Sequence, residues 1–264
     1  MIHPKVSIIT SVFNGGTYLE ETILSVLNQT YDNIEYIIID GGSTDNSVEI
    51  IKKYEARLAY WISEKDHGMY DGIAKGIARA TGEICAYINS DDFYQPTAIQ
   101  TVVEIMTQRP EIKWLSGMQA IYNTHSTIVN AFMQIPQSSI QIQKRYFPIQ
   151  QEITFWKSEL HQTIDWDRFR SFRLAGDYYM WFCFSSFAEH YVVRAILSGF
   201  RKHGKQLSSN YEAYKKELDT FCLKMNAIDR IKQKVICLAF FKFPKLFLRN
   251  RYMLKWDYML NKYV

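Results

Sequence analysis

Strand-like and helix-like segments alternate over the first 95 positions, and this alternation restricts the fold more than any other feature of the sequence. Buried strands are predicted from short β-branched and apolar runs over residues 5–13, 34–39, 60–63 and 84–88. Helices are predicted between them over residues 17–28, 48–57 and 69–80, the first with Thr17 as its N-cap. Strands and helices that alternate through short loops predict an α/β fold with a mostly parallel sheet and right-handed crossovers.

Polar side chains follow each of the four predicted strands. Asn14 follows the first, Asp40 the second, Asp66 the third, and the run 89–92 (NSDD) the fourth. Ligands of such sheets bind at the carboxyl ends of the strands, so these residues predict a binding site at one edge. Asn and Asp are also common turn residues, an alternative that explains two of the positions more easily than all four.

The paired acids Asp91 and Asp92 suggest a metal-bound diphosphate. Mg²⁺ and Mn²⁺ bind one or two carboxylates together with substrate phosphates. The alternative is that the pair caps a helix over residues 94–106. No G-x-G-x-x-G or G-x-x-x-x-G-K-[ST] motif lies near the strand ends, which disfavours a dinucleotide oxidoreductase and a P-loop NTPase.

Composition narrows the class of protein. The 264 residues are 47% apolar and 22% charged, which is sufficient for a sizeable core. The four cysteines are far apart and form no C-x-x-C pair, which argues against a zinc ribbon or a disulfide framework. The N-terminus enters a strand pattern without a signal-peptide pattern, and the apolar runs are shorter than the ~20 residues that span a bilayer. A cytoplasmic globular protein is expected.

The charge is divided unevenly along the chain. Residues 1–200 hold 16 Lys and Arg against 22 Asp and Glu, whereas residues 201–264 hold 15 against 5. The acidic body argues against nucleic acid as a partner. Residues 209–233 are predicted to be helical, and residues 235–260 mix aromatic with basic residues around Pro244, which is typical of helices lying on a membrane surface. The alternative is a helix that packs on the domain or on a second subunit.

The order KVSIITSVFN, IIIDGGSTD, GIARATGE and NSDD resembles the family 2 glycosyltransferases of the GT-A fold, of the inverting, bacterial surface-polysaccharide type. The resemblance is dense over residues 5–95 and continues loosely to about residue 208. It implies that Thr10, Val12, Asn14 and Asp40 bind uracil. It also implies that Asp91 lies near the ribose or the metal, and that Asp92 binds Mn²⁺ or Mg²⁺.

The stretch SEKDHGMYDGIAKG (63–76) resembles a loop and helix of the same family. It implies that Asp66 helps to recognise the nucleotide, while Asp71 and Lys75 line the donor cleft. Ala74 stands where the family pattern has Asn, and Asn89 replaces the acid that often begins the metal motif. The second departure leaves fewer carboxylates for the metal, so Asp92 would have to be the direct ligand.

Inverting transfer needs a carboxylate that accepts the proton of the attacking hydroxyl. The segment LAGDYYMWF (174–182) resembles the family element that supplies this base and implies that Asp177 is the catalytic residue. The apolar helix around it predicts a raised pKa for Asp177. The alternative is that Asp177 is the N-cap of this core helix, and the two roles are compatible with each other. Asp165 and Asp167 lie in a polar loop and are predicted to be surface charges.

Three further positions complete the implied site. Glu152 is predicted to face the acceptor, bonding either a sugar hydroxyl or Arg145. Trp156 either stacks on a sugar or lies in the core. In the loop 199–208, Arg201 and Lys202 are predicted to contact phosphate, and His203 either completes the metal shell or is solvated.

Together these features predict a GT-A domain over residues 1–208, with a nucleotide-sugar half (1–95) and an acceptor half (96–208), followed by a basic amphipathic helical tail (209–264). The predicted activity is metal-dependent transfer of a sugar from a nucleotide-sugar, a UDP-sugar in the first instance, to a glycan or polyprenyl-linked acceptor at the inner face of the cell membrane. A homodimer is compatible with the tail. The alternatives are a nucleotidyltransferase and a non-catalytic nucleotide-binding scaffold.

Overall fold

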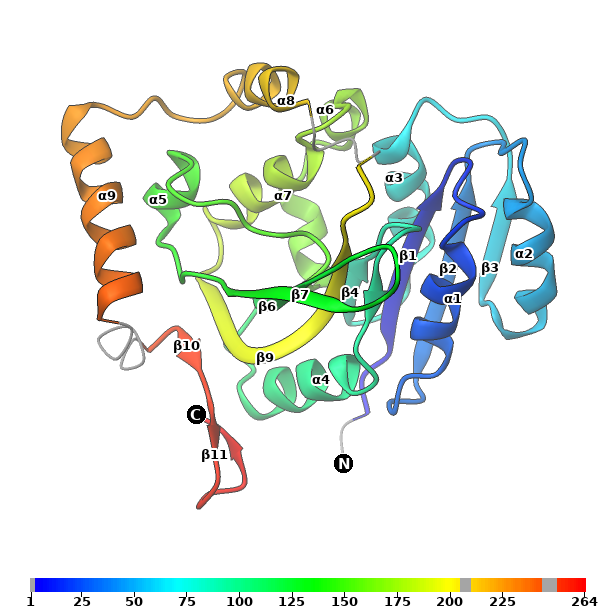
Figure 1. Ribbon diagram of the computed structural model, residues 1–264, viewed down its shortest axis with the longest axis horizontal. Coiled ribbons are helices and arrows are strands. Elements are labelled where there is room, and N and C mark those ends of the chain that lie inside the picture. Colours follow the sequence, from blue (N-terminus) through cyan, green and yellow to red (C-terminus); the bar gives the residue numbers. More distant parts are fainter. Residues whose placement is uncertain (1–2, 205–209, 244–250) are drawn as a thin grey trace.

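One large mixed sheet forms the centre of the molecule in the computed structural model, which describes residues 3–204, 210–243 and 251–264 (Figure 1). Its strands lie in the order β10-β9-β6-β8-β4-β1-β2-β3, with β5 on β9 and β7 on β6. The strands of this sheet are β1 (Val6–Val12), β2 (Ile34–Asp40), β3 (Tyr60–Ser63), β4 (Ile84–Tyr87), β5 (Phe93–Tyr94), β6 (Trp114–Tyr122), β7 (Ile128–Met133), β8 (Thr154–Lys157), β9 (His190–Arg201) and β10 (Met253–Leu254).

Helices connect most of these strands. They are α1 (Leu19–Leu27), α2 (Ser47–Tyr54), α3 (Met69–Arg79), α4 (Ala98–Gln108), α5 (Ser139–Gln143), α6 (Trp166–Ser171), α7 (Gly176–Phe184), α8 (Tyr211–Leu218) and α9 (Ala227–Lys242). Two 3₁₀ turns, η1 (Glu55–Arg57) and η2 (Ser158–Thr163), and a small hairpin of β11 (Trp256–Asp257) and β12 (Lys262–Tyr263) complete the described elements.

The first half of the chain builds a parallel unit. β1 pairs with β2 and β4, and β2 with β3, all in parallel. The chain therefore adds strands on one side of β1 and then crosses to the other side for β4. Right-handed crossovers put α1 and α2 on one face and α3 on the other. The carboxyl ends of β1 and β4 flank this reversal of strand order, where α/β sheets bind their ligands.

The second half extends the sheet and encloses an aromatic core. β8 runs antiparallel to both β4 and β6, whereas β6, β9 and β10 are parallel to one another. On α7, Trp181 stacks on Trp114 of β6 with ring centroids 5.7 Å apart, and both side chains are fully buried. The predicted α/β class with a mostly parallel sheet is confirmed.

The predicted elements of the first 90 residues are confirmed with small shifts at their ends, but the predicted starts of two helices, one of them the next along the chain, are wrong. Thr17 does not cap α1, which begins at Leu19 with Tyr18 as its N-cap. The helix predicted over residues 94–106 begins only at Ala98, because Phe93 and Tyr94 pair with β9 and Pro96 follows. Asp91 and Asp92 are therefore too far from α4 to cap it.

The tail differs most from its prediction. A single helix over residues 209–233 is wrong, since the chain breaks between α8 and α9, where Asn226 and Asp229 form a capping box that starts α9. Residues 251–264 contain short strands rather than helix, and Met253 and Leu254 extend the main sheet beside β9. The helical tail is thus helical only in part; residues 205–209 and the predicted break at Pro244 lie outside the described residues. Along the described segments, no helix is long and apolar enough to cross a bilayer.

Candidate active site

The loops that follow β1, β2 and β4 contact one another. Asn14 adopts a left-handed conformation (φ 51°), and its Oδ1 accepts the Thr44 amide at 2.8 Å. Gly15 lies so close to the β4 loop that a Cβ there would be 2.7 Å from Ser90 Oγ. The exposed Asn14 therefore stands where the sequence predicts it, at the carboxyl edge of the parallel unit.

Asp40 ends β2 as a fully buried carboxylate. Its Oδ2 accepts the Ser63 hydroxyl at 2.6 Å and the amides of Gly42 and Ser43, and its Oδ1 accepts the Ser43 hydroxyl at 2.5 Å. These donors hold the β2 loop against the end of β3. A ligand can reach this carboxylate only if the Ser43 hydroxyl moves aside.

Asp66 lies beside Asp40 because two glycines leave room for it. A Cβ on Gly41 would be 2.7 Å from Asp66 Oδ2, and one on Gly72 would be 3.2 Å from the same atom and 2.5 Å from Ser11 Oγ. Burial raises the pKa of Asp66, and the charges of Asp71 and Asp40 add to the rise. Ser11, Asp40, Ser63 and Asp66, here called the β1–β3 edge, thus form one polar group.

The parity of β1 corrects one part of the predicted site. Thr10 is fully buried and bonded to the Tyr36 hydroxyl at 3.0 Å, and Val12 is 1% exposed. Both side chains lie in the core, so a contact of either side chain with a base is wrong. The reachable side chains at the end of β1 are the alternate ones, namely the half-buried Ser11 and Phe13, which is 66% exposed. Period-2 alternation separates these sets, but it does not say which set faces a ligand.

Asp71 and Lys75 lie one turn apart on α3. Lys75 Nζ is 2.9 Å from Glu64 and 3.6 Å from Asp71, and Arg170 of α6 approaches Asp71 at 3.5 Å. The side chain of Asp71 is 9% exposed and that of Lys75 is 30% exposed. This ion-pair network borders the β1–β3 edge and joins α3 to α6.

Of the two adjacent acids, Asp91 rather than Asp92 contacts His203. Asp91 Oδ2 is 2.8 Å from His203 Nε2, and the His203 ring stacks on Tyr18. Asp92 is 1% exposed and its Oδ1 accepts the Arg201 amide at 2.9 Å. The side chains of His203 and Asp91 are 14 and 29% exposed, so this pair is more accessible to a cation than the enclosed Asp92. Across the described ranges, no cluster of three or more His, Cys, Asp or Glu side chains is arranged around a metal position.

Arg201 is buried beneath this pair. Its guanidinium bonds Glu21 Oε2 at 2.5 Å, Ser126 Oγ at 3.0 Å and the Asp91 carbonyl at 3.1 Å. The rings of Tyr18 and Phe93 lie 4.6 and 5.2 Å from it. With 1% exposure, Arg201 supports the Asp91–Asp92 segment instead of contacting phosphate, which corrects the prediction.

Glu152 is a buried acid whose pKa is affected by both Asp91 and Asp177. It is 2% exposed, and Gln119 donates to its Oε1 at 2.6 Å, whereas its predicted partner Arg145 pairs with Asp219. Burial raises the pKa of Glu152 to about 7, and the charges of Asp177 and Asp91 contribute. Burial likewise raises the pKa of Asp92, with contributions from Asp91 and Glu152. Asp91, Asp92, Glu152 and Asp177, here called the carboxylate site, are therefore electrostatic neighbours.

Asp177 lies in the first turn of α7. Its Oδ1 accepts the Tyr178 amide at 2.7 Å and lies 3.4 Å from the hydroxyl of Tyr70 on α3. Gly176 is required before it, because a Cβ there would be 2.7 Å from the Tyr70 ring. Burial raises the pKa of Asp177 to about 6, against the opposing effects of the Tyr178 and Tyr70 bonds. A carboxyl group with this pKa is suited to accept a proton near neutral pH.

Burial decides between the alternatives for Trp156 and for the two rival acids, Asp165 and Asp167. Trp156 is fully buried, donates to His161 Nε2 at 2.9 Å and packs against Trp181, so stacking on a sugar is wrong and the core alternative holds. Asp165 caps α6 and the side chain of Asp167 is 99% exposed, as predicted for surface charges. Sequence reasoning missed Ser11, Phe13, Glu21, Tyr70 and Gln119. Ser11, Phe13 and Tyr70 lie within the quoted motifs, whereas no motif covers Glu21 or Gln119.

Comparison with known proteins gives the family. The profile described as Glycosyl transferase family 2 matches residues 7–171, which is more than half of the chain. The chain belongs to this family, abbreviated GT2. The GT2 chain is 33% identical over 138 residues to an uncharacterized glycosyltransferase of Nostoc, covering 51% of this chain and 43% of that one. It is 40% identical over 116 residues to one of Mycobacterium tuberculosis, covering 43% and 44%. The GT2 chain thus spans less than half the length of these relatives.

Solved structures of GT-A type share the fold of this GT2 chain. Staphylococcus aureus TarS in complex with UDP-GlcNAc superposes with a TM-score of 0.58 at 16% identity, covering 90% of this chain and 73% of TarS. The mannosyltransferase PcManGT from Pyrobaculum calidifontis, in complex with GDP-Man and Mn²⁺, gives 0.61 at 14% identity, covering 83% and 63%. The predicted GT-A fold is confirmed.

Proposed function

We propose that this GT2 chain is an inverting glycosyltransferase that moves a sugar from a UDP-sugar to a hydroxyl group of a glycan or lipid-linked oligosaccharide. The observation that supports the proposal is the carboxylate site, in which Asp91 and Asp177, 86 positions apart, both raise the pKa of the buried Glu152. A metal-binding carboxylate and a proton acceptor within one site are the groups that such a transfer requires.

The nucleotide would lie along the β1–β3 edge. Asp66 offers an acceptor to the single N3–H of uracil, Asp40 would do so once the Ser43 hydroxyl moves aside, and Ser11 and Asn14 add polar contacts. Phe13 has an exposed ring that can stack on the base. Asp71 and Lys75 would line the cleft toward the donor sugar.

Asp91 and His203 would hold Mn²⁺ or Mg²⁺, and Asp92 and Arg201 would keep Asp91 in place from beneath. Bound there, the metal would offset the charge that develops on the departing diphosphate. The 2.8 Å contact between Asp91 and His203 supports this assignment. It replaces the prediction that Asp92 is the direct metal ligand.

Asp177 would accept the proton of the acceptor hydroxyl. The oxygen attacks the anomeric carbon as the bond to the diphosphate breaks on the opposite face, so the configuration inverts and the nucleoside diphosphate leaves. Because the pKa of Asp177 is raised to about 6, its carboxylate is more basic than an ordinary Asp and still ionised at pH 7. Glu152 would border the space in which the sugars meet.

We further propose that the enzyme acts at the inner face of the cell membrane, in synthesis of a surface polysaccharide. On α9, Ile228, Ile231, Val235 and Leu238 form one stripe, each more than half exposed, and Arg230, Lys232, Lys234 and Lys242 lie on the same helix. The turn of the β11–β12 hairpin adds Tyr258, Met259 and Leu260, which are 88, 93 and 59% exposed. Apolar stripes with basic residues favour an anionic lipid surface.

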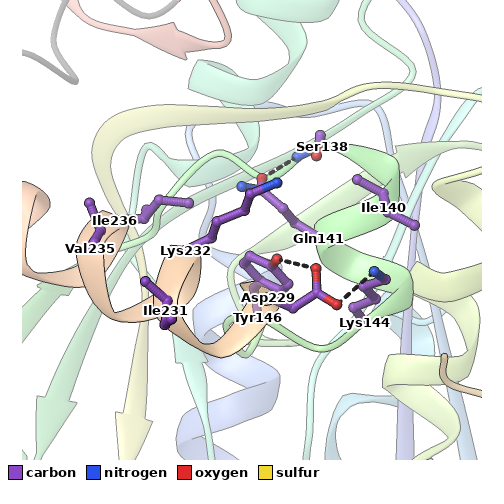
Figure 2. A pocket seen from close by; sticks show the side chains of 10 residues that line it. All are labelled: Ser138, Ile140, Gln141, Lys144, Tyr146, Asp229, Ile231, Lys232, Val235 and Ile236. Atoms are coloured by element: carbon purple, nitrogen blue, oxygen red, sulfur yellow. Dashed lines mark hydrogen bonds and ion pairs between the residues drawn. The ribbon is translucent and has the colours of Figure 1, made fainter. Parts of the chain in front are cut away.

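α9 is fixed to the domain by its inner side. Asp229 bonds Lys144 at 2.7 Å and the Tyr146 hydroxyl at 2.9 Å at one end of a cavity of about 430 Å³ between α5 and α9 (Figure 2). Ile231 and Val235 of the exposed stripe also line this cavity, so the stripe borders its open side. None of the carboxylate site residues lines it, so it is separate from the proposed donor site.

Asp177→Asn tests the activity. Transfer from UDP-sugars with Mn²⁺ should fall by about 10²–10⁴-fold, the usual contribution of a general base, while UDP affinity is unchanged. Asp167→Asn, at the 99% exposed acid of α6, is the matched control and should leave transfer unchanged. Transfer that survives Asp177→Asn would overturn the base assignment. UDP binding without transfer by the wild type over a panel of sugars would favour the non-catalytic scaffold.

A further inference from the structure

A glutamate of the C-terminal segment bonds the backbone that leads into α7. Glu217 Oε1 accepts the amide of Arg173 at 2.9 Å, and its Oε2 accepts those of Leu174 and Ala175 at 2.9 and 2.8 Å. One carboxylate from α8 thus binds three consecutive N–H groups immediately before α7. No side chain of α7 itself caps this helix, whose N-cap is Ala175.

The same segment is bonded from the opposite side. The Tyr70 hydroxyl donates to the Leu174 carbonyl at 2.9 Å and lies 3.4 Å from Asp177 Oδ1. The entrance to α7 is therefore fixed through its amides by Glu217 and through a carbonyl by Tyr70. Asp177 follows Ala175 by two residues, so a shift of this entrance would move its carboxyl group.

α8 is itself anchored on the domain next to Glu217. Phe221 packs edge-on against Phe172 and Tyr179 with centroids 5.4 and 5.3 Å apart. Asp219 pairs with Arg145 at 2.8 Å, and Arg168 donates to the Thr220 carbonyl. In Figure 1 α8 lies beside α6, above α7. These contacts give Glu217 a defined position although the family profile ends at residue 171.

We propose that Glu217 is a positioning residue for Asp177: it holds the backbone at the entrance of α7 and places a fixed negative charge near the proposed base. This inference rests on the proposed role of Asp177. It makes α8, which lies in the predicted tail, a part of the catalytic half of the molecule.

The charge of Glu217 has a predictable effect on the pKa of Asp177. The groups that face Asp177 are Tyr70 on α3, Tyr87 on β4, Glu152, Tyr178 on α7, and Tyr214 and Glu217 on α8. Burial is the main cause of the raised pKa of Asp177, and Glu217 raises it further. Removing the charge of Glu217 favours the ionised form of Asp177 and therefore lowers the pKa of Asp177.

Two substitutions of Glu217 separate the effect of its charge from the effect of its side-chain length. Glu217→Gln keeps the length but loses the charge and one acceptor, so the acidic limb of the kcat profile should move to lower pH. Glu217→Asp keeps the charge but is one methylene shorter, so kcat should fall about tenfold with the acidic limb unmoved. KM for the UDP-sugar should stay within twofold in both. Glu212→Gln, an exposed position on the same helix, is the control and should change neither quantity.

Amide hydrogen exchange of residues 173–175 adds a readout independent of activity. Exchange should be faster in both Glu217 variants and unchanged in Glu212→Gln. One outcome would overturn the inference: both Glu217 variants have a lower melting temperature, but neither kcat nor the acidic limb of the kcat profile changes. Glu217 would then have a structural role only. If Asp177→Asn remains active while exchange responds as expected, the base assignment fails and the backbone contact stands.

Discussion

Alternate residues of β1 face opposite sides of the sheet, so neighbouring residues differ in whether their side chains can contact a ligand. Thr10 and Val12 point into the core, where Thr10 bonds Tyr36, while Ser11 lies beside Asp66 and Phe13 is exposed. Both faces of a central parallel strand are covered, so apolar and small polar residues occur on each. The resemblance therefore named Thr10 and Val12, whose side chains are buried, whereas Ser11 and Phe13 are the more accessible side chains at this strand end.

Phe13→Ala should weaken UDP binding about fivefold, because stacking of an aromatic ring contributes about 1 kcal/mol. Isothermal titration with UDP and Mn²⁺ measures the change. Phe187→Ala is a matched control, since Phe187 is equally exposed (66%) and lies just beyond α7. Equal affinities of the two variants would show that the base lies elsewhere.

Transfer should depend on pH through Asp177. The pKa of Asp177 is raised to about 6, and only the ionised carboxylate accepts a proton, so activity should fall as pH drops below about 6 and level off above it. Because Glu152, with a pKa of about 7, interacts with Asp177, the measured midpoint belongs to the pair. Steady-state rates between pH 5 and 9 test this; a rate that rises on acidification would contradict the role of Asp177.

At the scale of elements, the end of β9 supports the segment that contains Asp91 and Asp92. Arg201 bonds the Asp91 carbonyl and, through its amide, Asp92, while Glu21 of α1 holds its guanidinium. Two elements far apart in the sequence, β9 and α1, thus fix one pair of acids. Sequence spacing gave no sign of this contact, since Glu21 and Arg201 are 180 positions apart.

Arg201→Lys should lower the free energy of unfolding by about 2 kcal/mol, because Lys cannot make the forked contacts of a buried guanidinium. It should also raise the Mn²⁺ concentration needed for half-maximal transfer, as Asp91 becomes less constrained. Urea denaturation and Mn²⁺ titration measure the two effects. Arg194→Lys on the exposed part of the same strand should change neither. An unchanged Mn²⁺ requirement would separate Arg201 from the metal motif.

The stability contributed by Asp229, which anchors α9 to the domain, should depend on pH. The Lys144 bond and the Asn226 amide lower the pKa of Asp229 to about 2. A carboxylate whose pKa is lower in the folded state than in the unfolded state stabilises the protein at pH values above its unfolded-state pKa. This stabilisation is lost as the pH falls through the folded-state pKa. Asp229→Asn should therefore lower the melting temperature at pH 7, with a difference from wild type that shrinks below about pH 4. A difference independent of pH would exclude the ion pair as its cause.

At the scale of the whole molecule, the α9 stripe and the hairpin turn are the surfaces through which membrane contact is expected. Deletion of residues 235–264 would also remove β10 from the sheet, so point substitutions are the sharper test. Ile231→Glu with Leu238→Glu should abolish co-sedimentation with vesicles containing anionic lipid and leave UDP affinity unchanged. Phe187→Glu, equally exposed elsewhere, should still bind. Unchanged vesicle binding would reject the surface, and a dimer lost in the double variant would assign the stripe to a second copy.

The sequence alone determined the parallel unit, because apolar periodicity and turn residues are local and the strand ends carry the acids Asp40, Asp66, Asp91 and Asp92. It also indicated Asp177 through a motif confined to neighbouring residues. Only the tertiary structure decided the rest: the face of Thr10, the burial of Trp156 and Arg201, the pairing of His203 with Asp91, and the contact of Glu217 with the entrance of α7. These depend on how distant segments exclude water from one another, and no local pattern encodes that.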